Sequence, residues 1–239
     1  MDNFWNWLQH CRTDFCDSFY LNFIKDDRWR YLWDGFGTTI GISFAAVLLG
    51  VLLGFTVAVI RSTHDKTGKL RLLNWLCRLY LTVIRGTPVV VQLLIIYFVI
   101  FGSVNVSKIL VAIVAFGVNS GAYVAEIIRG GIMSIDRGQF EAGRSLGLSY
   151  IQTMIYIILP QAFKNVLPAL GNEFIVLLKE TSVSGYIALQ DLTKGGDIIR
   201  SQTYTAFMPL IAVALIYLAV VMLFSRLLNK LERRLKNNE

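Results

Sequence analysis

The segment from Thr39 to Ile60 limits the possible folds of this chain more than any other feature, because it contains no charged residue. A helix needs about 20 apolar residues to cross the hydrocarbon core of a bilayer. The rest of the chain has the same character: 55% of its 239 residues are hydrophobic, 16% are charged, and the mean hydropathy is +0.56. These values exceed those of ordinary soluble domains. The sequence therefore predicts a membrane protein whose first span is this segment.

Four further apolar segments follow the first, so the chain is predicted to be an all-α, polytopic membrane protein of about five spans. The segment near residue 180 has the weakest pattern, because Glu173, Lys179 and Glu180 interrupt it. It is still counted as a span. The predicted spans cover residues 39–60, 79–101, 109–128, 167–189 and 205–224.

The distribution of Lys and Arg predicts the orientation. Residues 61–78, residues 129–164 and the C-terminal tail together hold 14 of them, whereas the opposite side holds 7. Because positive residues are enriched in cytoplasmic loops, the N-terminus is expected outside and the C-terminus in the cytoplasm. The net charge of +7 is thereby explained without a nucleic-acid partner.

Three regions are predicted from composition. Residues 1–34 mix Trp and Tyr with Asp and Arg, which is typical of an amphipathic segment at the membrane interface. Residues 35–228 form the transmembrane domain, and residues 229–239 form a basic cytoplasmic tail. With three cysteines, two histidines and no Cys/His cluster, no metal site is predicted.

The segment from Ser134 to Leu148 cannot be a span, because charged side chains at the centre of a bilayer cost a few kcal/mol each. Four lie within it: Asp136, Arg137, Glu141 and Arg144. Residues 130–164 are therefore predicted to be cytoplasmic, with a helix that begins at Ser134 or Asp136 and ends at Gly147.

A second short helix is predicted to follow directly. Ser149 and Gln152 have the spacing of a capping box, and the helix is expected to end near Pro160. The two helices would be joined by a turn at Gly147 and Leu148.

On the first of these helices, Phe140, Gly143 and Leu146 recur at helical spacing, with Ala142 beside them. Small residues permit close approach, and the aromatic and leucine side chains act as anchors. This pattern indicates a surface that inserts into a partner. The alternative is a loop folded back on its own bundle.

The stretch "EAGRSLGLSYIQTMIYIILPQA" resembles the EAA loop of bacterial ABC-importer permeases. Three more stretches are similar to the polar amino acid branch of that family, which includes histidine, glutamine and arginine uptake systems. They are "RGTPVVVQ" (85–92), "NSGAYVAEIIRGGI" (119–132) and "LPALGNEFIVLLKETS" (167–182). The resemblance covers about residues 35–230. Gly143 departs mildly from the alanine of the EAA triplet but remains small.

The resemblance implies a permease subunit in a bacterial cytoplasmic membrane that works with several partners. These would be two copies of an ABC ATPase subunit, a second permease that is identical or paralogous, and an extracytoplasmic amino acid-binding protein, all within membrane lipid. The EAA-like segment would be the coupling helix, with Glu141 marking the docking element and Gly147 its turn.

No nucleotide site is predicted in the chain itself. A P-loop requires G-x-x-x-x-G-K-[ST], but Gly68-Lys69 is followed by Leu70 and has Thr63 at the first glycine position. The chain is therefore not expected to be an enzyme or to hold a cofactor, and ATP and Mg²⁺ would be bound by the partner ATPase.

Glu173, beside Asn172 in the fourth predicted span, is the first candidate for a solute contact. An intramembrane carboxylate is costly and can pair with an α-ammonium group or a cationic side chain. The alternative is a structural pairing with Lys179 or with a neighbouring span.

Polar residues of the second and third spans are further candidates. Asn119, Ser120 and Tyr123 either line a polar cavity or hydrogen-bond between helices. Pro88 is expected to kink the second span, which would turn Gln92, one turn on, toward the same cavity.

Two other patterns favour structure over chemistry. Glu126 and Arg129 lie three residues apart, which favours a local ion pair. Gly50 and Gly54 form a G-x-x-x-G pattern, which favours helix packing.

The sequence thus predicts the permease subunit of an ATP-driven importer for a polar or basic L-amino acid. An ion-gradient-driven amino acid carrier is the alternative, but such a carrier has no use for the capped cytoplasmic helix pair. An intramembrane enzyme is disfavoured, because neither histidine lies in a predicted span.

Overall fold

The computed structural model describes residues 13–236, and all regular elements in this range are helices. Residues 13–19 are helical and lead into η1 (Tyr20–Ile24), η2 (Lys25–Asp27), α2 (Trp29–Thr67), α3 (Arg71–Gly86), α4 (Val89–Ile95), η3 (Ile96–Ile100) and α5 (Lys108–Met133). Then come α6 (Arg137–Ser145), α7 (Tyr150–Thr153), η4 (Met154–Ile158), α8 (Leu159–Glu180), η5 (Thr181–Ile187), α9 (Leu192–Thr203) and α10 (Phe207–Lys236).

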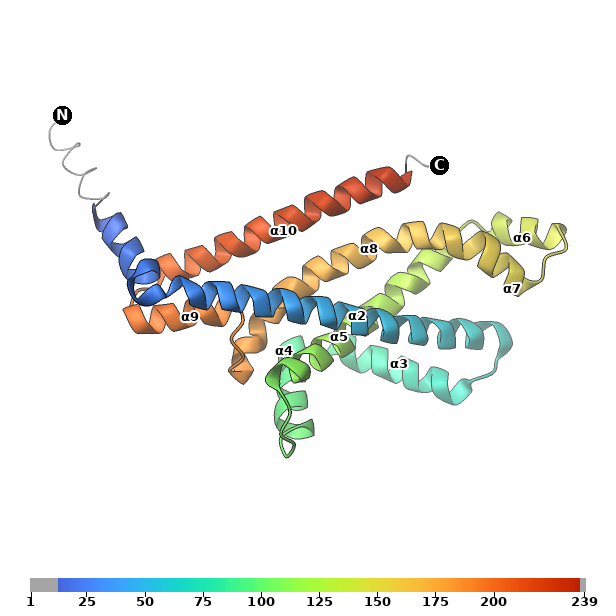
Figure 1. Cartoon of the computed structure of the whole chain (residues 1–239). Helices are drawn as coiled ribbons and strands as arrows, with labels where there is room; N and C mark the ends of the chain where they lie inside the picture. Colours follow the sequence, from blue (N-terminus) through green and yellow to red (C-terminus); the bar gives the residue numbers. More distant parts are fainter. Residues whose placement is uncertain (1–12, 237–239) are drawn as a thin grey trace.

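Within the described range, four helical stretches are long and apolar enough to cross a membrane. They contain α2, α5, α8 and α10. The pair formed by α3 and the α4–η3 segment gives a fifth span if its 112° bend is counted as a break within one span. The prediction of an all-α protein with about five spans is confirmed. Figure 1 shows α2 along the length of the molecule, with α9 near one end and the α6–α7 hairpin at the other.

Helix α2 begins at Trp29, so the helix extends beyond the predicted span 39–60. Its early turns pack on the segment before α9: a Cβ atom at Gly35 would lie 2.4 Å from the Asp191 carbonyl oxygen. The Leu192 amide also donates a hydrogen bond to Thr39 Oγ1 at 3.1 Å. Part of the predicted interfacial segment 1–34 therefore belongs to α2, and its residues 1–12 lie outside the described range.

The prediction that the helix after the turn ends near Pro160 is wrong. The chain stays helical from Tyr150 to Ile187, and Pro160 sits in the first turn of α8. A proline is tolerated there because the regular i→i−4 hydrogen bonds are already interrupted at the end of η4, where the Leu159 amide bonds to the Met154 carbonyl oxygen. The π-helical turn η4 directly before α8 provides the change of helical register.

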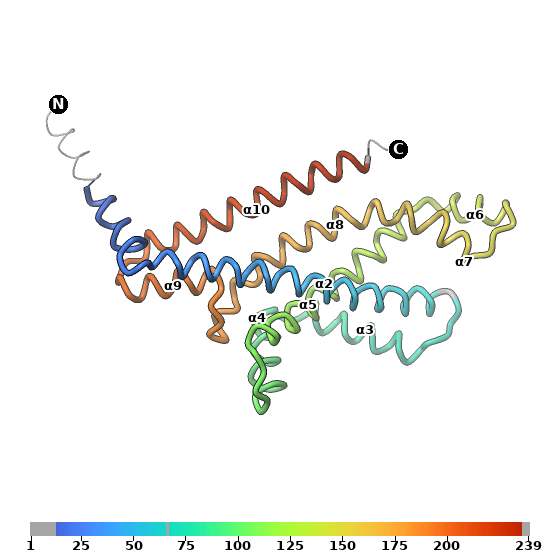
Figure 2. The backbone as a smooth tube through the Cα atoms, viewed as in Figure 1, coloured from blue at the N-terminus to red at the C-terminus, as the bar shows by residue number. Residues whose placement is uncertain are grey.

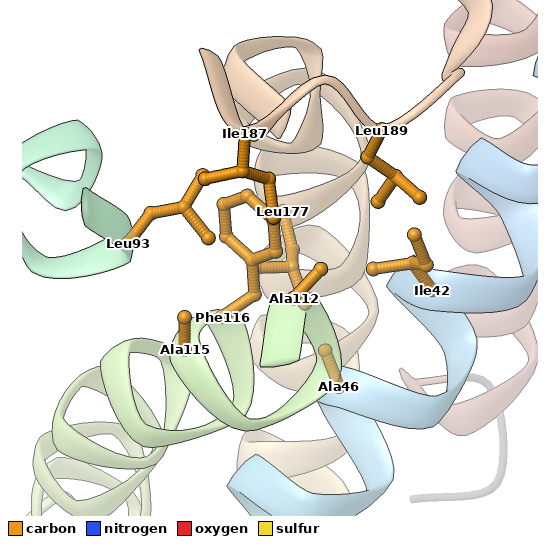
Figure 3. Packing of buried hydrophobic residues seen from close by; sticks show 9 residues of the cluster. All are labelled: Ile42, Ala46, Leu93, Ala112, Ala115, Phe116, Leu177, Ile187 and Leu189. Atoms are coloured by element: carbon orange, nitrogen blue, oxygen red, sulfur yellow. The ribbon is translucent and has the colours of Figure 1, made fainter. Parts of the chain in front are cut away.

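The main core lies where α2, α4, α5, α8 and η5 meet. Figure 3 shows Phe116 of α5 at its centre, surrounded by apolar side chains of the other elements. The prediction that Gly50 and Gly54 serve helix packing is confirmed, because a Cβ atom at Gly54 would lie 2.6 Å from Val124 Cγ1 of α5. Close approach of α2 and α5 thus depends on small residues.

Candidate coupling hairpin and polar intramembrane sites

The α6–α7 hairpin forms with the capping residues that the sequence indicates. The Asp136 carboxylate accepts a hydrogen bond from the Gly138 amide at 2.6 Å at the start of α6. Gly147 follows α6 with a φ of +76°, a conformation that favours glycine. Ser149 and Gln152 then form a complete capping box at the start of α7. These local predictions are confirmed, and the tube in Figure 2 shows the chain reversing between the two helices.

The two helices of the hairpin touch through only part of the predicted insertion surface. Gly143 is buried against α7, where an added Cβ would lie 2.6 Å from Thr153 Cγ2. The half-buried Phe140 ring stacks on Tyr150, with 6.4 Å between ring centroids. These residues hold the hairpin closed.

The remaining members of that surface point away from the chain. Leu146 has 76% of its surface exposed, and Glu141 and Ala142 are also exposed. An exposed leucine at the end of a charged helix is a suitable contact site for another protein.

Pro88 breaks the second span as predicted, and Gln92 bridges the break. Its side-chain amide donates to the carbonyl oxygens of Ile84 at 2.7 Å and of Thr87 at 3.0 Å. These acceptors lie at the end of α3, where carbonyl groups lack intrahelical donors. Gln92 is buried and in turn accepts a hydrogen bond from Asn119 Nδ2 at 3.0 Å. Gln92 and Asn119 thus come together, and they tie α3 and α4 to α5.

Tyr123 and Glu126 lie further along α5 and, together with Asn119, form a polar row on this helix. The Arg85 guanidinium carbon lies 5.8 Å from the centroid of the Tyr123 ring, a cation–π contact. Glu126 Oε1 accepts a hydrogen bond from Arg61 at 2.7 Å. The row faces α2 and α3.

The expected local ion pair between Glu126 and Arg129 is therefore replaced by pairs between helices. Glu126 binds Arg61 of α2, and Arg129 lies 3.8 Å from Asp65 of the same helix. The parallel packing of α2 on α5 brings these partners within reach. Arg61 was missed as a site residue, because by sequence it belongs to the basic loop after the first span.

Glu173 lies on a different side of α5 from this row. Its carboxylate oxygen Oε1 accepts a hydrogen bond from Ser120 Oγ at 2.9 Å, whereas the neighbouring Asn119 points to Gln92. Glu173 is half-buried and Asn172 is exposed. Neither Glu173 nor Lys179 forms an ion pair within residues 13–236, so a pair with Lys179 is not found. The Ser120 bond does join Glu173 to a neighbouring span, which was the other structural alternative.

The pattern of the family described as "Binding-protein-dependent transport system inner membrane component" matches residues 46–237 of this chain. The chain belongs to this family. It is a permease component of the amino acid ABC-transporter type, as its relatives indicate.

Three similarities illustrate the relationship. The permease is 37% identical to the putative glutamine transport system permease protein GlnP of Rickettsia typhi, over 86% of its own length and 93% of the relative's. It is 36% identical to the arginine transport system permease protein ArtQ of Bacillus subtilis, with coverages of 87% and 94%. It matches a crystal structure of an amino acid ABC transporter with histidines at 44% identity and a TM-score of 0.80, with coverages of 86% and 94%.

The end of the permease opposite the hairpin carries a compact charged group on α9. Asp197 accepts hydrogen bonds from Lys194 Nζ at 2.8 Å and from Arg200 Nε at 3.0 Å. These bonds, Lys194 first, lower the pKa of the Asp197 carboxyl below its ordinary value. The group stays ionised at neutral pH and gives this end of the permease a fixed pattern of charge.

Proposed function

We propose that this permease translocates a polar or basic L-amino acid delivered by an extracytoplasmic binding protein, with energy from a separate ATPase that docks on the α6–α7 hairpin. The working assembly would contain two ATPase subunits and a second permease, identical or paralogous, in a bacterial cytoplasmic membrane. In this assembly, ATP and Mg²⁺ are bound by the ATPase. ATP-driven closure of the ATPase pair would move the hairpins as rigid bodies and reorient the spans.

Coupling is supported most directly by the hairpin, in which some residues pack inside and others face outward. Gly143 and Phe140 close it on α7, whereas Leu146 and Glu141 face outward. A rigid, capped helix pair transmits a push better than a loop does, and its exposed leucine supplies an apolar anchor for a groove.

Leu146→Asp tests the docking surface without disturbing the packing of the hairpin. We expect a tagged permease carrying this change to retain, in a pull-down, no more than about one tenth of the ATPase that the wild type retains. Loss of a central anchor residue has an effect of this size. Glu141→Lys should act in the same direction, and so should Gly147→Asp, which strains the turn at positive φ.

Leu70→Asp is the matched control for Leu146→Asp. Leu70 is also exposed, it lies in the turn between α2 and α3, and its φ of +59° suits aspartate. Full retention of the ATPase by Leu146→Asp, or equal loss with Leu70→Asp, would refute docking through the hairpin.

Glu173 is the proposed solute contact, because its carboxylate has no cationic partner among the described residues and is held in place by Ser120. A positive group on the solute would supply that partner. Asn172 is exposed next to it, and Gln92, Asn119 and Tyr123 are proposed as further solute contacts on the other side of α5.

Uptake of labelled arginine, histidine and glutamine into proteoliposomes tests this role. Glu173→Gln preserves an acceptor for Ser120 but removes the charge. We expect about tenfold slower uptake of a cationic solute, and little change in the protein's thermal stability. Ser120→Ala is the control, since it removes the hydrogen bond and keeps the charge. If Glu173→Gln transports every solute at the wild-type rate, Glu173 has no solute role.

A further inference from the structure

A cavity of about 460 Å³ lies between α2, α3 and α5, and its charged lining residues are Arg61, Arg78, Arg85 and Glu126. Glu126 Oε1 pairs with Arg61 at 2.7 Å, and the Arg85 guanidinium lies 3.9 Å from the same oxygen atom. Arg78 forms no ion pair with the described part of the chain. Three guanidinium groups therefore line the cavity with a single carboxylate, and only two of them pair with it.

The cavity lies where α2 leaves the apolar part of the bilayer. Arg61 follows directly on the uncharged segment 39–60, and the α2–α3 turn comes a few residues later (Figure 1). This depth corresponds to the headgroup region on the side of the basic loops. Uncompensated positive charge next to the hydrocarbon is unfavourable, so the cavity favours an anion.

The shape of α3 indicates what kind of anion fits. Arg78 and Arg85 are two helical turns apart and so share one edge of the helix. The exposed side beside that edge is apolar: Leu72, Leu79 and Val83 have 70%, 47% and 49% of their surface exposed. A ligand seated here meets guanidinium groups at one end and a lipid-like surface at the other.

We propose that this cavity binds the phosphate group of an anionic phospholipid from the cytoplasmic leaflet. Arg78 and Arg85 hold the phosphate, and Glu126 keeps Arg61 in place beside them. The acyl chains lie against the apolar side of α3. The site requires only that the chain spans the membrane, so it is independent of the proposed solute and of ATPase docking.

Native mass spectrometry of the full-length permease, released from detergent micelles with either phosphatidylglycerol or phosphatidylcholine, tests the site. The wild type should retain phosphatidylglycerol in preference to phosphatidylcholine. Arg78→Gln and Arg85→Gln should each weaken phosphatidylglycerol binding about fivefold, which is the contribution of one basic side chain near an anionic surface. Arg78→Lys should keep most of the binding, since a phosphate accepts either cation.

Arg71→Gln is the matched control. Arg71 lies on the same edge of α3, two turns before Arg78, but outside the cavity. Equal loss in this variant, or equal retention of the two lipids by the wild type, overturns the proposal. Displacement of the lipid by millimolar inorganic phosphate, glutamine or arginine also overturns it, because the cavity would then be a site for small anions or solute. If Arg78→Gln does not fold, Arg85→Gln and Arg78→Lys decide the question.

Discussion

Helices α5 and α10 are both membrane spans, but they relate to the rest of the chain in opposite ways. The more apolar of the two is α10, yet only 11% of its most apolar stretch is buried, against 61% for α5. The buried helix is the one that carries Asn119, Ser120 and Glu126. Within a bilayer, lipid is as apolar as a leucine side chain, so apolar character alone does not bring helices together.

Close packing of α5 instead comes from small residues and interhelical hydrogen bonds. A Cβ atom at Gly117 would lie 2.6 Å from Leu49 Cδ2 of α2, and Tyr80 of α3 donates a hydrogen bond to the Val118 carbonyl oxygen at 2.6 Å. In contrast, α10 exposes most of its leucines. Stability should therefore respond strongly to changes in α5 and weakly to changes in α10.

The largest effect is expected for Phe116→Ala. Phe116 is fully buried at the centre of the main core (Figure 3), so its truncation leaves a cavity and should cost about 3–5 kcal/mol in the free energy of unfolding. Thermal unfolding of the purified permease in detergent measures the loss. Phe207→Ala, at a position of α10 with 71% exposure, is the control and should have little effect. Similar losses in the two variants would remove the contrast between the helices.

Gly54→Ala is expected to have the next largest effect. The added methyl group would meet Val124 Cγ1 at 2.6 Å and the Ala125 backbone nitrogen at 2.8 Å, so α2 and α5 must separate. Overpacking of this kind costs about 1–3 kcal/mol. Gly41→Ala on the same helix has open space around it and should be neutral or slightly stabilising. Both variants replace a glycine by alanine in the same helix, so the change in helix propensity is the same. The difference between their unfolding temperatures therefore reports the contact with α5.

Gln92→Leu should destabilise the permease by about 1–2 kcal/mol. The change leaves the Ile84 and Thr87 carbonyl oxygens without the donor that bridges the broken span, and it also removes the acceptor for Asn119. Val91→Leu, at the preceding and exposed position, is the control for added volume. Wild-type stability of Gln92→Leu would mean that the bend does not depend on this bridge.

Local chemistry made the hairpin predictable, because a cap or a turn is specified by residues a few positions apart. Asp136, Gly147 and the pair Ser149 and Gln152 all act as their spacing indicates. The existence of the spans was predictable for the same reason, since length and hydropathy are local properties.

Predictions failed where the partner came from a distant part of the chain. Helix α2 extends back to Trp29, and no local pattern reveals that its Gly35 packs against the backbone of Asp191. Glu126 likewise takes Arg61 as its partner, 65 residues away, in place of the nearby Arg129. The candidate solute residues divide between two sides of α5, because the adjacent Asn119 and Ser120 point to different helices.

The smallest effect is expected for Leu218→Ala on α10. Leu218 is 54% exposed, so lipid or detergent surrounds much of its side chain whether or not the permease is folded. The free energy of unfolding should therefore change by less than about 0.5 kcal/mol. The same measurement on the wild type at several protein concentrations separates two causes of a larger loss. If the unfolding temperature of the wild type falls with dilution, the exposed face of α10 is covered by a second permease subunit, and the low burial of this helix belongs to the single chain and not to the assembly.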